Sequence, residues 1–200
     1  MTPFADFHTH NLLAPPGALI NLPPEVVAAG PGAFRFRPGV AYSVGLHPWQ
    51  VSTGWPAFMP RLQEWLALEP VQAVGECGLD RLCGVPRTLQ CEAFAAQLEL
   101  AARAGKWVVV HCVRGWDDLW PLLRRAAWPE GRVVIHGFRG KPQQLRQLLA
   151  HGCGVSFGPR FNALSLRACP PARRHAETDN SGLGIEAVRA LHRQALEGAG

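Results

Sequence analysis

Short runs of β-branched and apolar residues alternate along this chain with longer segments in which apolar residues recur at helical spacing. Strands are predicted at residues 5–9, 41–45, 71–75, 107–112, 132–137, 154–157 and 174–178. Helices are predicted between them, at residues 56–68, 88–104, 116–127, 142–151 and 184–196. This alternation is typical of parallel strands joined by crossover helices, so the fold class is α/β. Because seven strands approach the eight of a closed barrel, we expect a TIM-type (β/α) barrel that is compact or incomplete.

Two connections interrupt this pattern. Residues 15–39 contain six prolines, which break helices, so a long loop is predicted after the first strand. Residues 165–173 are irregular in a similar way, and a shortened connection is predicted there.

Length and composition favour a single domain over residues 1–200. A chain of 200 residues that is 48% hydrophobic can bury one substantial core. Its apolar runs are far shorter than the roughly 20 residues that cross a bilayer, so no membrane contact is expected. The amino terminus lacks a basic start followed by an apolar block, and the six cysteines form no CxxC pair. We expect a reduced, cytoplasmic protein with no obligate protein partner.

The strongest local signal is the segment Asp-Phe-His-Thr-His at residues 6–10. Side chains alternate along a strand, so His8 and His10 point to one side, where both imidazoles can reach one metal ion. Further candidates stand at or just past the carboxyl ends of predicted strands: Glu76, His111, His136 and Asp179. Active sites of parallel α/β barrels are built at that end, so we expect these groups to converge.

These six side chains predict a metal centre at the carboxyl ends of the strands. A lone buried histidine or strand-end aspartate more often has a structural role, but six of them at successive strand ends favour metal ligation. Four neutral imidazoles and two carboxylates suit two divalent ions of the Mg, Mn or Zn type. Glu76 is the candidate for a carboxylate that bridges the two ions.

Seven motifs, taken in order, carry a resemblance to a known family. They are DFHTH at 6–10, GLHPW at 45–49, VGECGLD at 74–80, VVVHC at 108–112, HGFRG at 136–140, GVSFG at 154–158 and ETD at 177–179. In these motifs the chain resembles a short variant of the TatD family of metal-dependent deoxyribonucleases, within the amidohydrolase-like metal hydrolases. HGFRG stands where HCFSG is commoner in that family, and residues 180–182 replace a proline-containing turn.

The resemblance implies a hydrolase that cleaves phosphodiester bonds in DNA, as a 3′-5′ exonuclease, through a water activated by two metal ions. It implies two ligand sets that share Glu76. One set adds His8, His10 and Asp179, and the other adds His111 and His136. Asp179 would also accept a proton from the attacking water.

Three further residues are candidates for contacting the substrate. His47, in GLHPW, stands at another strand end and is predicted to bind or protonate a phosphate oxygen, as a third catalytic residue beside Glu76 and Asp179. Arg114 and Arg139 each follow a predicted ligand by three residues, close enough to grip a phosphate. The alternatives are a structural histidine in the turn and solvated surface arginines.

The net charge of +5 comes almost wholly from arginine, because the chain has only two lysines. Arginine binds phosphate bidentately, so the charge favours a polyanionic substrate, and the resemblance implies that this is DNA, as single strands or 3′ ends. Two other interpretations are open. One is a PHP-type or other amidohydrolase-like phosphoesterase acting on a small substrate, because DxHxH also opens the PHP family. The other is a metal-binding barrel without turnover.

Overall fold

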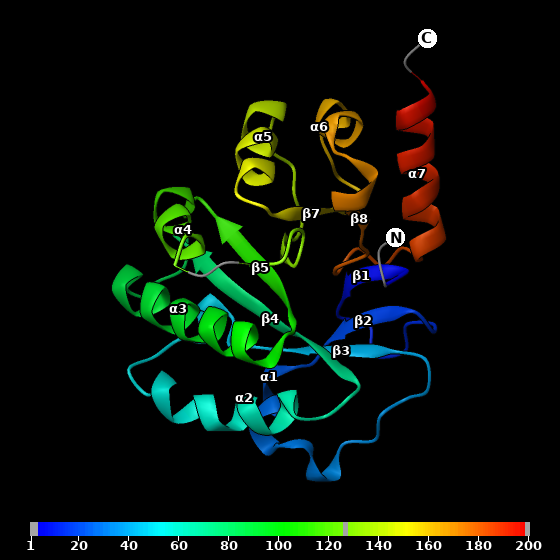
Figure 1. Ribbon diagram of the computed structural model, residues 1–200. Coiled ribbons are helices and arrows are strands. Elements are labelled where there is room, and N and C mark those ends of the chain that lie inside the picture. The colour runs from blue at the N-terminus through cyan, green and yellow to red at the C-terminus, as the bar shows by residue number, and fades with distance from the viewer. Residues whose placement is uncertain (1–3, 126–127, 199–200) are drawn as a thin grey trace.

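The computed structural model describes residues 4–125 and 128–198, and eight parallel strands form its centre in chain order (Figure 1). The strands are β1 (Asp6–Thr9), β2 (Ala18–Asn21), β3 (Ala41–Val44), β4 (Val71–Asp80), β5 (Trp107–Val113), β6 (Val133–Ile135), β7 (Gly154–Phe157) and β8 (Arg174–Ala176). The α-helices are α1 (Pro24–Ala29), α2 (Met59–Leu66), α3 (Arg87–Ala104), α4 (Trp116–Leu123), α5 (Pro142–Ala150), α6 (Ala163–Ala168) and α7 (Ile185–Glu197). Short 3-10 helices lie at η1 (Pro31–Ala33), η2 (Pro48–Gln50), η3 (Trp55–Phe58) and η4 (Pro171–Arg173).

The sheet curls until its first and last strands meet. Thr9 forms a parallel bridge with Asp179, whose backbone N–H donates to the His8 carbonyl at 2.9 Å. The Asp6 carboxylate accepts the backbone N–H and the hydroxyl of Thr178 at 3.0 and 2.7 Å. These contacts bring the sheet close to a full circle, so the fold is a TIM-type barrel, as predicted. We refer to this junction of β1 with the segment after β8 as the seam.

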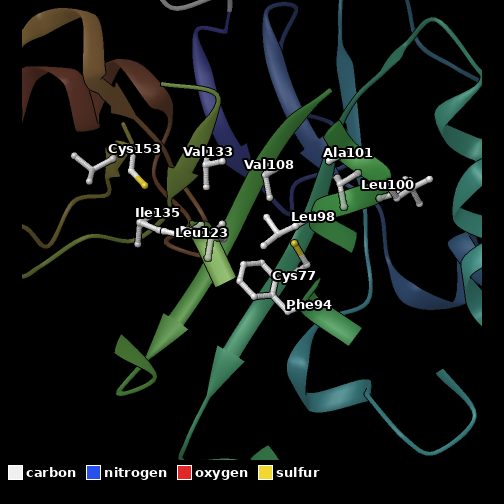
Figure 2. Close-up of a cluster of buried hydrophobic side chains, with 14 of the residues drawn as sticks. Cys77, Phe94, Leu98, Leu100, Ala101, Val108, Leu123, Val133, Ile135 and Cys153 are labelled. Atoms are coloured by element: carbon white, nitrogen blue, oxygen red, sulfur yellow. The ribbon is translucent and has the colours of Figure 1, made fainter. Parts of the chain in front are cut away.

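The strands are buried on both faces, as parallel strands between a packed interior and outer helices must be. Apolar side chains from five different strands form one cluster inside the barrel: Phe7, Leu19, Ala73, Val109 and Val134. Val108 and Val110 belong instead to the larger cluster between strands and helices. Figure 2 shows part of this outer cluster, in which Phe94 and Leu98 of α3 lie against Cys77 of β4. Side chains therefore alternate between inside and outside along β5, with His111 two residues beyond Val109.

The predicted loop at residues 15–39 was wrong, because it contains strand β2 and helix α1. The prolines flank these elements without interrupting β2. Pro15 and Pro16 precede the strand, and Pro24 occupies the start of α1, where a missing N–H costs nothing. The barrel therefore has eight strands, one more than the alternation of the sequence indicated.

Two further boundaries differ from the predictions. The stretch predicted as irregular, 165–173, includes most of α6, whose first turn is capped by the Asn162 side chain accepting the Ser165 N–H at 3.1 Å. Strand β4 continues to Asp80, so Glu76 lies within a strand and not just past its end. Helix α4 begins at Trp116 as predicted and ends at Leu123, and the predicted end of that helix, 126–127, lies outside the described residues.

None of the helices in the described ranges is both long enough and apolar enough to cross a membrane.

His175 of β8 is a buried polar group at the inner cluster. Its ring lies 4.2 Å from that of Phe7, and neither ring nitrogen has a hydrogen-bond partner within residues 4–125 and 128–198. Burial lowers its pKa from an ordinary 6.5 to about 4, although Glu177 acts in the opposite direction. The folded protein therefore keeps His175 neutral at pH values where the unfolded chain protonates it.

We expect the wild type to lose stability relative to a His175→Leu variant as the pH falls through this window. Since the unfolded chain binds the proton first, the free energy of unfolding falls below pH 6.5, by about 3 kcal/mol at pH 4 relative to the variant. Urea unfolding of both proteins at pH values from 7.5 to 4 measures the difference. Parallel pH curves for the two proteins would contradict the assignment.

Candidate active site

Glu76 is the centre of the site, because both oxygens of its buried carboxylate are surrounded by imidazoles. Oε2 lies 3.3 Å from Nε2 of His8 and 3.4 Å from Nε2 of His10. Oε1 lies near three other rings, at 2.7 Å from His136 Nε2, 2.8 Å from His111 Nδ1 and 3.3 Å from His47 Nε2. Five histidines, from β1 and its carboxyl end, β5, the end of β6 and the loop after β3, thus converge on one side chain. This is the convergence that the strand-end positions predicted.

Asp179 completes the cluster from the other end of the chain. Its Oδ1 lies 3.8 Å from His8 Nε2 and 3.6 Å from His10 Nε2. The backbone of Asp179 has φ of 49°, in the left-handed region that aspartate tolerates better than most residues. The seam holds it there, through hydrogen bonds with the backbones of His8 and His10.

The chemistry of these donors fits divalent cations. Within residues 4–125 and 128–198, three groups have ligand atoms that lie close together: His8, His136 and Asp179; His8, His10 and Glu76; and His47, Glu76 and His111. Both ring nitrogens of His8 and Nδ1 of His136 are buried without a hydrogen-bond partner in the described part of the chain. Buried polar nitrogens without partners are costly, and a cation would satisfy those that point into the cluster.

Two carboxylates outside this cluster orient the histidines. His111 has Nε2 at 3.2 Å from Asp80 Oδ2, which also accepts the indole N–H of Trp49 at 2.7 Å. His136 has Nδ1 at 3.7 Å from Glu177 Oε1. Glu177 is itself fixed, because it accepts the Gly137 N–H at 2.6 Å and the hydroxyl of Ser156. In each pair, one ring nitrogen faces a carboxylate and the other faces Glu76, which is how ligand histidines are oriented in metal sites.

The backbone of Glu76 is fixed by the strand that the sequence did not reveal. The Asn21 side chain, at the end of β2, accepts the Glu76 N–H at 2.7 Å and the Ser43 hydroxyl at 3.0 Å. An amide in this buried position ties β2, β3 and β4 together directly beneath the carboxylate.

His47 has a defined tautomer. Its Nδ1 accepts the Trp49 backbone N–H at 3.2 Å, so the neutral ring carries its proton on Nε2, the nitrogen that faces Glu76. A protonated nitrogen donates a hydrogen bond and does not ligate a metal. Leu46, the preceding residue, is clamped by Gln97 of α3, which accepts its N–H at 2.7 Å and donates to its carbonyl at 3.1 Å.

The pKa shifts agree with an ionised carboxylate in contact with protonated imidazole. Burial acts to raise the pKa of Glu76, but His136, His10 and His111 outweigh it and hold that pKa well below its ordinary value. Burial acts to lower the pKa of His136, but Glu76 and Glu177 raise it well above its ordinary value. The Glu76 carboxylate is therefore ionised, as a metal ligand has to be.

A cavity of about 460 Å³ opens over the cluster. The residues that line it are His10, Asn21, Leu22, Pro23, Pro24, Glu25, Gly45, His47, Trp49, Gln50, Glu76, His111, His136, Asp179 and Asn180. Arg114 and Arg139 are exposed and, within the described ranges, do not line it. The structure thus brings together seven of the nine residues that the sequence singled out, and it places these two arginines elsewhere.

Sequence reasoning did not identify Glu177 and Asn21 and left the role of Asp80 open. Glu177 stands two residues before Asp179, at the spacing that puts both on one side of an extended segment, and this signal was available. Arg81, the residue after Asp80, pairs instead with Asp117 and Asp118 at 3.4 and 3.2 Å.

Comparisons with known proteins give a family context for this geometry. Residues 32–180 match the family model of TatD-related DNases. A 3′-5′ ssDNA/RNA exonuclease TatD from Musicola paradisiaca is 36% identical over 154 residues, which are 71% of this chain and 58% of that protein. Its namesake from Escherichia coli K12 is 34% identical over 118 residues, or 58% of this chain and 45% of that protein. The crystal structure of YJJV, a TatD homologue from Escherichia coli K12, superposes with a TM-score of 0.63 at 27% identity, covering 80% of this chain and 70% of that one. This chain spans about half the length of the curated relatives it matches.

Proposed function

Because the chain belongs to the TatD-related DNase family, we propose that it is a metal-dependent nuclease that hydrolyses phosphodiester bonds of single-stranded DNA from the 3′ end. The observation that supports this most is the convergence of His8, His10, His111 and His136 on the Glu76 carboxylate beneath an open cavity. Relatives of similar sequence carry the name 3′-5′ ssDNA/RNA exonuclease, which supports the choice of substrate.

We propose that two divalent ions, of the Mg, Mn or Zn type, are held by two ligand sets that share Glu76. His8, His10 and Asp179 complete one set, and His111 and His136 complete the other. When bound, such ions act as Lewis acids on the phosphoryl oxygens and make water a better nucleophile near neutral pH. Asp80 and Glu177 keep the rings of His111 and His136 oriented toward Glu76.

The protein supplies a base and an acid on opposite sides of Glu76. Asp179 is partly exposed, lines the cavity, and can accept the proton of the attacking water. His47 donates from Nε2 and, because its tautomer is set by the Trp49 N–H, we assign it to a phosphate oxygen and not to a metal. His47, Glu76 and Asp179 are therefore the proposed catalytic residues.

The cavity fits a terminal nucleotide. Its volume of about 460 Å³ lies within the range of small-molecule sites. Trp49 is 64% exposed at its rim, with its indole N–H held by Asp80, so one face of a rigid ring is available for a base. Leu22, Pro23 and Pro24 supply an apolar wall.

We expect chelator treatment to abolish nucleotide release from a single-stranded oligonucleotide and re-addition of Mg, Mn or Zn to restore it. Elemental analysis of the purified protein should find close to two divalent ions per chain. Release of mononucleotides, followed by chromatography with a label at the 3′ or the 5′ end, shows which end is attacked.

The other interpretations make different predictions for the same experiment. Bound metal together with hydrolysis of a small phosphomonoester, but not of DNA, would indicate a phosphoesterase acting on a small substrate. Bound metal with no turnover on either substrate would indicate a metal-binding barrel. A protein that binds no metal at all would overturn the proposed function.

A further inference from the structure

A second groove lies on the same face of the barrel as the candidate site, and nothing in the proposed chemistry uses it. It has a volume of about 590 Å³ and is lined by Arg139, Pro159, Arg160, Phe161, Asn162 and Leu191. We call it the β7 groove, because Pro159–Asn162 follow β7 directly. Arg139 follows β6, so both arginines extend from the carboxyl ends of parallel strands, the end that also carries the metal cluster.

Two arginine side chains give this groove a positive charge. Arg139 and Arg160 are both exposed. In the described part of the chain, the arginines in ion pairs are Arg61, Arg81, Arg87, Arg103, Arg173 and Arg189. Neither Arg139 nor Arg160 is among them, so both can bind an anion without first breaking an ion pair. The planar guanidinium group of arginine can donate two parallel hydrogen bonds to the oxygens of one phosphate.

The loop that carries Arg139 is fixed to the walls of the metal site. Its N-terminal end is held by the Gly137 N–H, which donates to Glu177 at 2.6 Å, and by the Phe138 N–H, which donates to the Ser156 carbonyl at 2.9 Å. Its C-terminal end is held by the Ser165 hydroxyl, which donates to the Gly140 carbonyl at 2.7 Å. Arg139 therefore sits on a short, anchored span that begins next to His136.

The opposite wall is apolar and equally well anchored. The Phe161 ring packs edge-on against that of His192, with ring centroids 4.8 Å apart. His192 in turn donates from Nε2 to the Gly158 carbonyl at 3.1 Å. Leu191, 38% exposed on α7, continues this wall. The β7 groove thus combines a cationic side with a rigid aromatic and aliphatic side.

We propose that the β7 groove binds a nucleotide of the same single strand whose end lies in the cavity, with its phosphate between Arg139 and Arg160 and its base against Phe161 and Leu191. This inference rests on the proposed function. Its basis is the match between the groove and a nucleotide. The anionic phosphate of a nucleotide complements the two arginines, and the flat face of its base can pack against apolar side chains beside them. Arg139 would then bind a phosphate next to the one that is cleaved, which agrees with its position outside the cavity.

Binding of a 5′-fluorescein dT octamer, measured by anisotropy with chelator present so that the strand stays intact, tests the groove. We expect Arg160→Ala to weaken binding about five- to tenfold at low salt and to make the slope of log K against log salt shallower by about 0.7, the value for one lost phosphate contact. Arg146→Ala removes an exposed arginine of α5 that does not line the groove, and it is the matched control. Equal affinity and slope for the two variants would overturn the proposal.

A second measurement tests the base contact. Wild type should bind the dT octamer more tightly than an abasic octamer, and Leu191→Ser should reduce that ratio. An unchanged ratio would show that the base does not contact Leu191 in the groove.

The outcomes for the groove can be distinguished from those for the proposed function. If wild type releases nucleotides but Arg160→Ala binds as wild type does, only the groove is wrong. If Arg160→Ala weakens binding but wild type releases nothing, the groove stands and the hydrolysis is wrong.

Discussion

Replacing Glu76 with glutamine is expected to lower the rate of nucleotide release at least about a thousandfold. The amide has nearly the same shape but no charge, and one of its ends becomes a donor facing imidazole nitrogens at 2.7 to 3.4 Å. It can no longer act as a carboxylate shared by two cations, so the metal content should fall as well. Initial rates on a labelled oligonucleotide and elemental analysis of the same sample measure the two effects.

The matched control for this substitution is Glu99→Gln. Glu99 lies on α3 with an exposed side chain, 3.9 Å from Arg103. An exposed pair of this kind contributes little to stability, so activity and thermal unfolding should both match wild type. A Glu76→Gln protein that folds as the wild type does but retains more than about a tenth of its rate would contradict the central role given to Glu76.

Replacing Gly78 with alanine is expected to destabilise the protein by about 4 kcal/mol or more, or to prevent folding. Gly78 lies in β4 opposite His111, and an added Cβ would stand 2.0 Å from the His111 carbonyl oxygen. The clash is with backbone inside a paired strand, so no side-chain rotation relieves it. The φ of Gly78, +142°, is also unfavourable for any residue with a Cβ.

Urea unfolding of Gly78→Ala, beside Gly84→Ala, measures this effect. Gly84 lies a few residues further along, with no atom within 4 Å of an added Cβ and no positive φ. Its substitution should change the free energy of unfolding by no more than about 0.5 kcal/mol. A Gly78→Ala protein as stable as Gly84→Ala would mean that β4 and β5 do not approach each other as described.

The sequence predicted the barrel from the alternation of strands and helices, and the cluster from side-chain alternation and from the rule that active sites form at the carboxyl ends of parallel strands. In β5, Trp107, Val109 and His111 share one face, and the last of them is at the carboxyl end where sites form. That rule holds on every parallel strand, so His8, His10, His111 and His136 could be placed together without knowing any contact.

The parts that were missed depend on neighbours in space. The predicted strand ended at Gly75, yet the pairing of β4 with β5 carries it on to Asp80. Asp80 therefore reaches His111, which no local pattern indicated. Strand β2 is four residues long and set among prolines, so only its pairing with β1 and β3 defines it. Arg139 has the spacing of a site residue, but the course of its loop takes it into the next groove.

The seam also has a consequence for how the protein is made. A ribosome synthesises the chain from its amino end, so His8 and His10 emerge well before Asp179. Since the bridge from Thr9 to Asp179 joins these regions, the proposed ligand set is completed only when the segment after β8 docks on β1. A chain that stalls or is cut short before that point carries most of the histidines but an incomplete centre. The proposed nuclease is thus inactive until its barrel has closed, and activity itself reports that folding is finished.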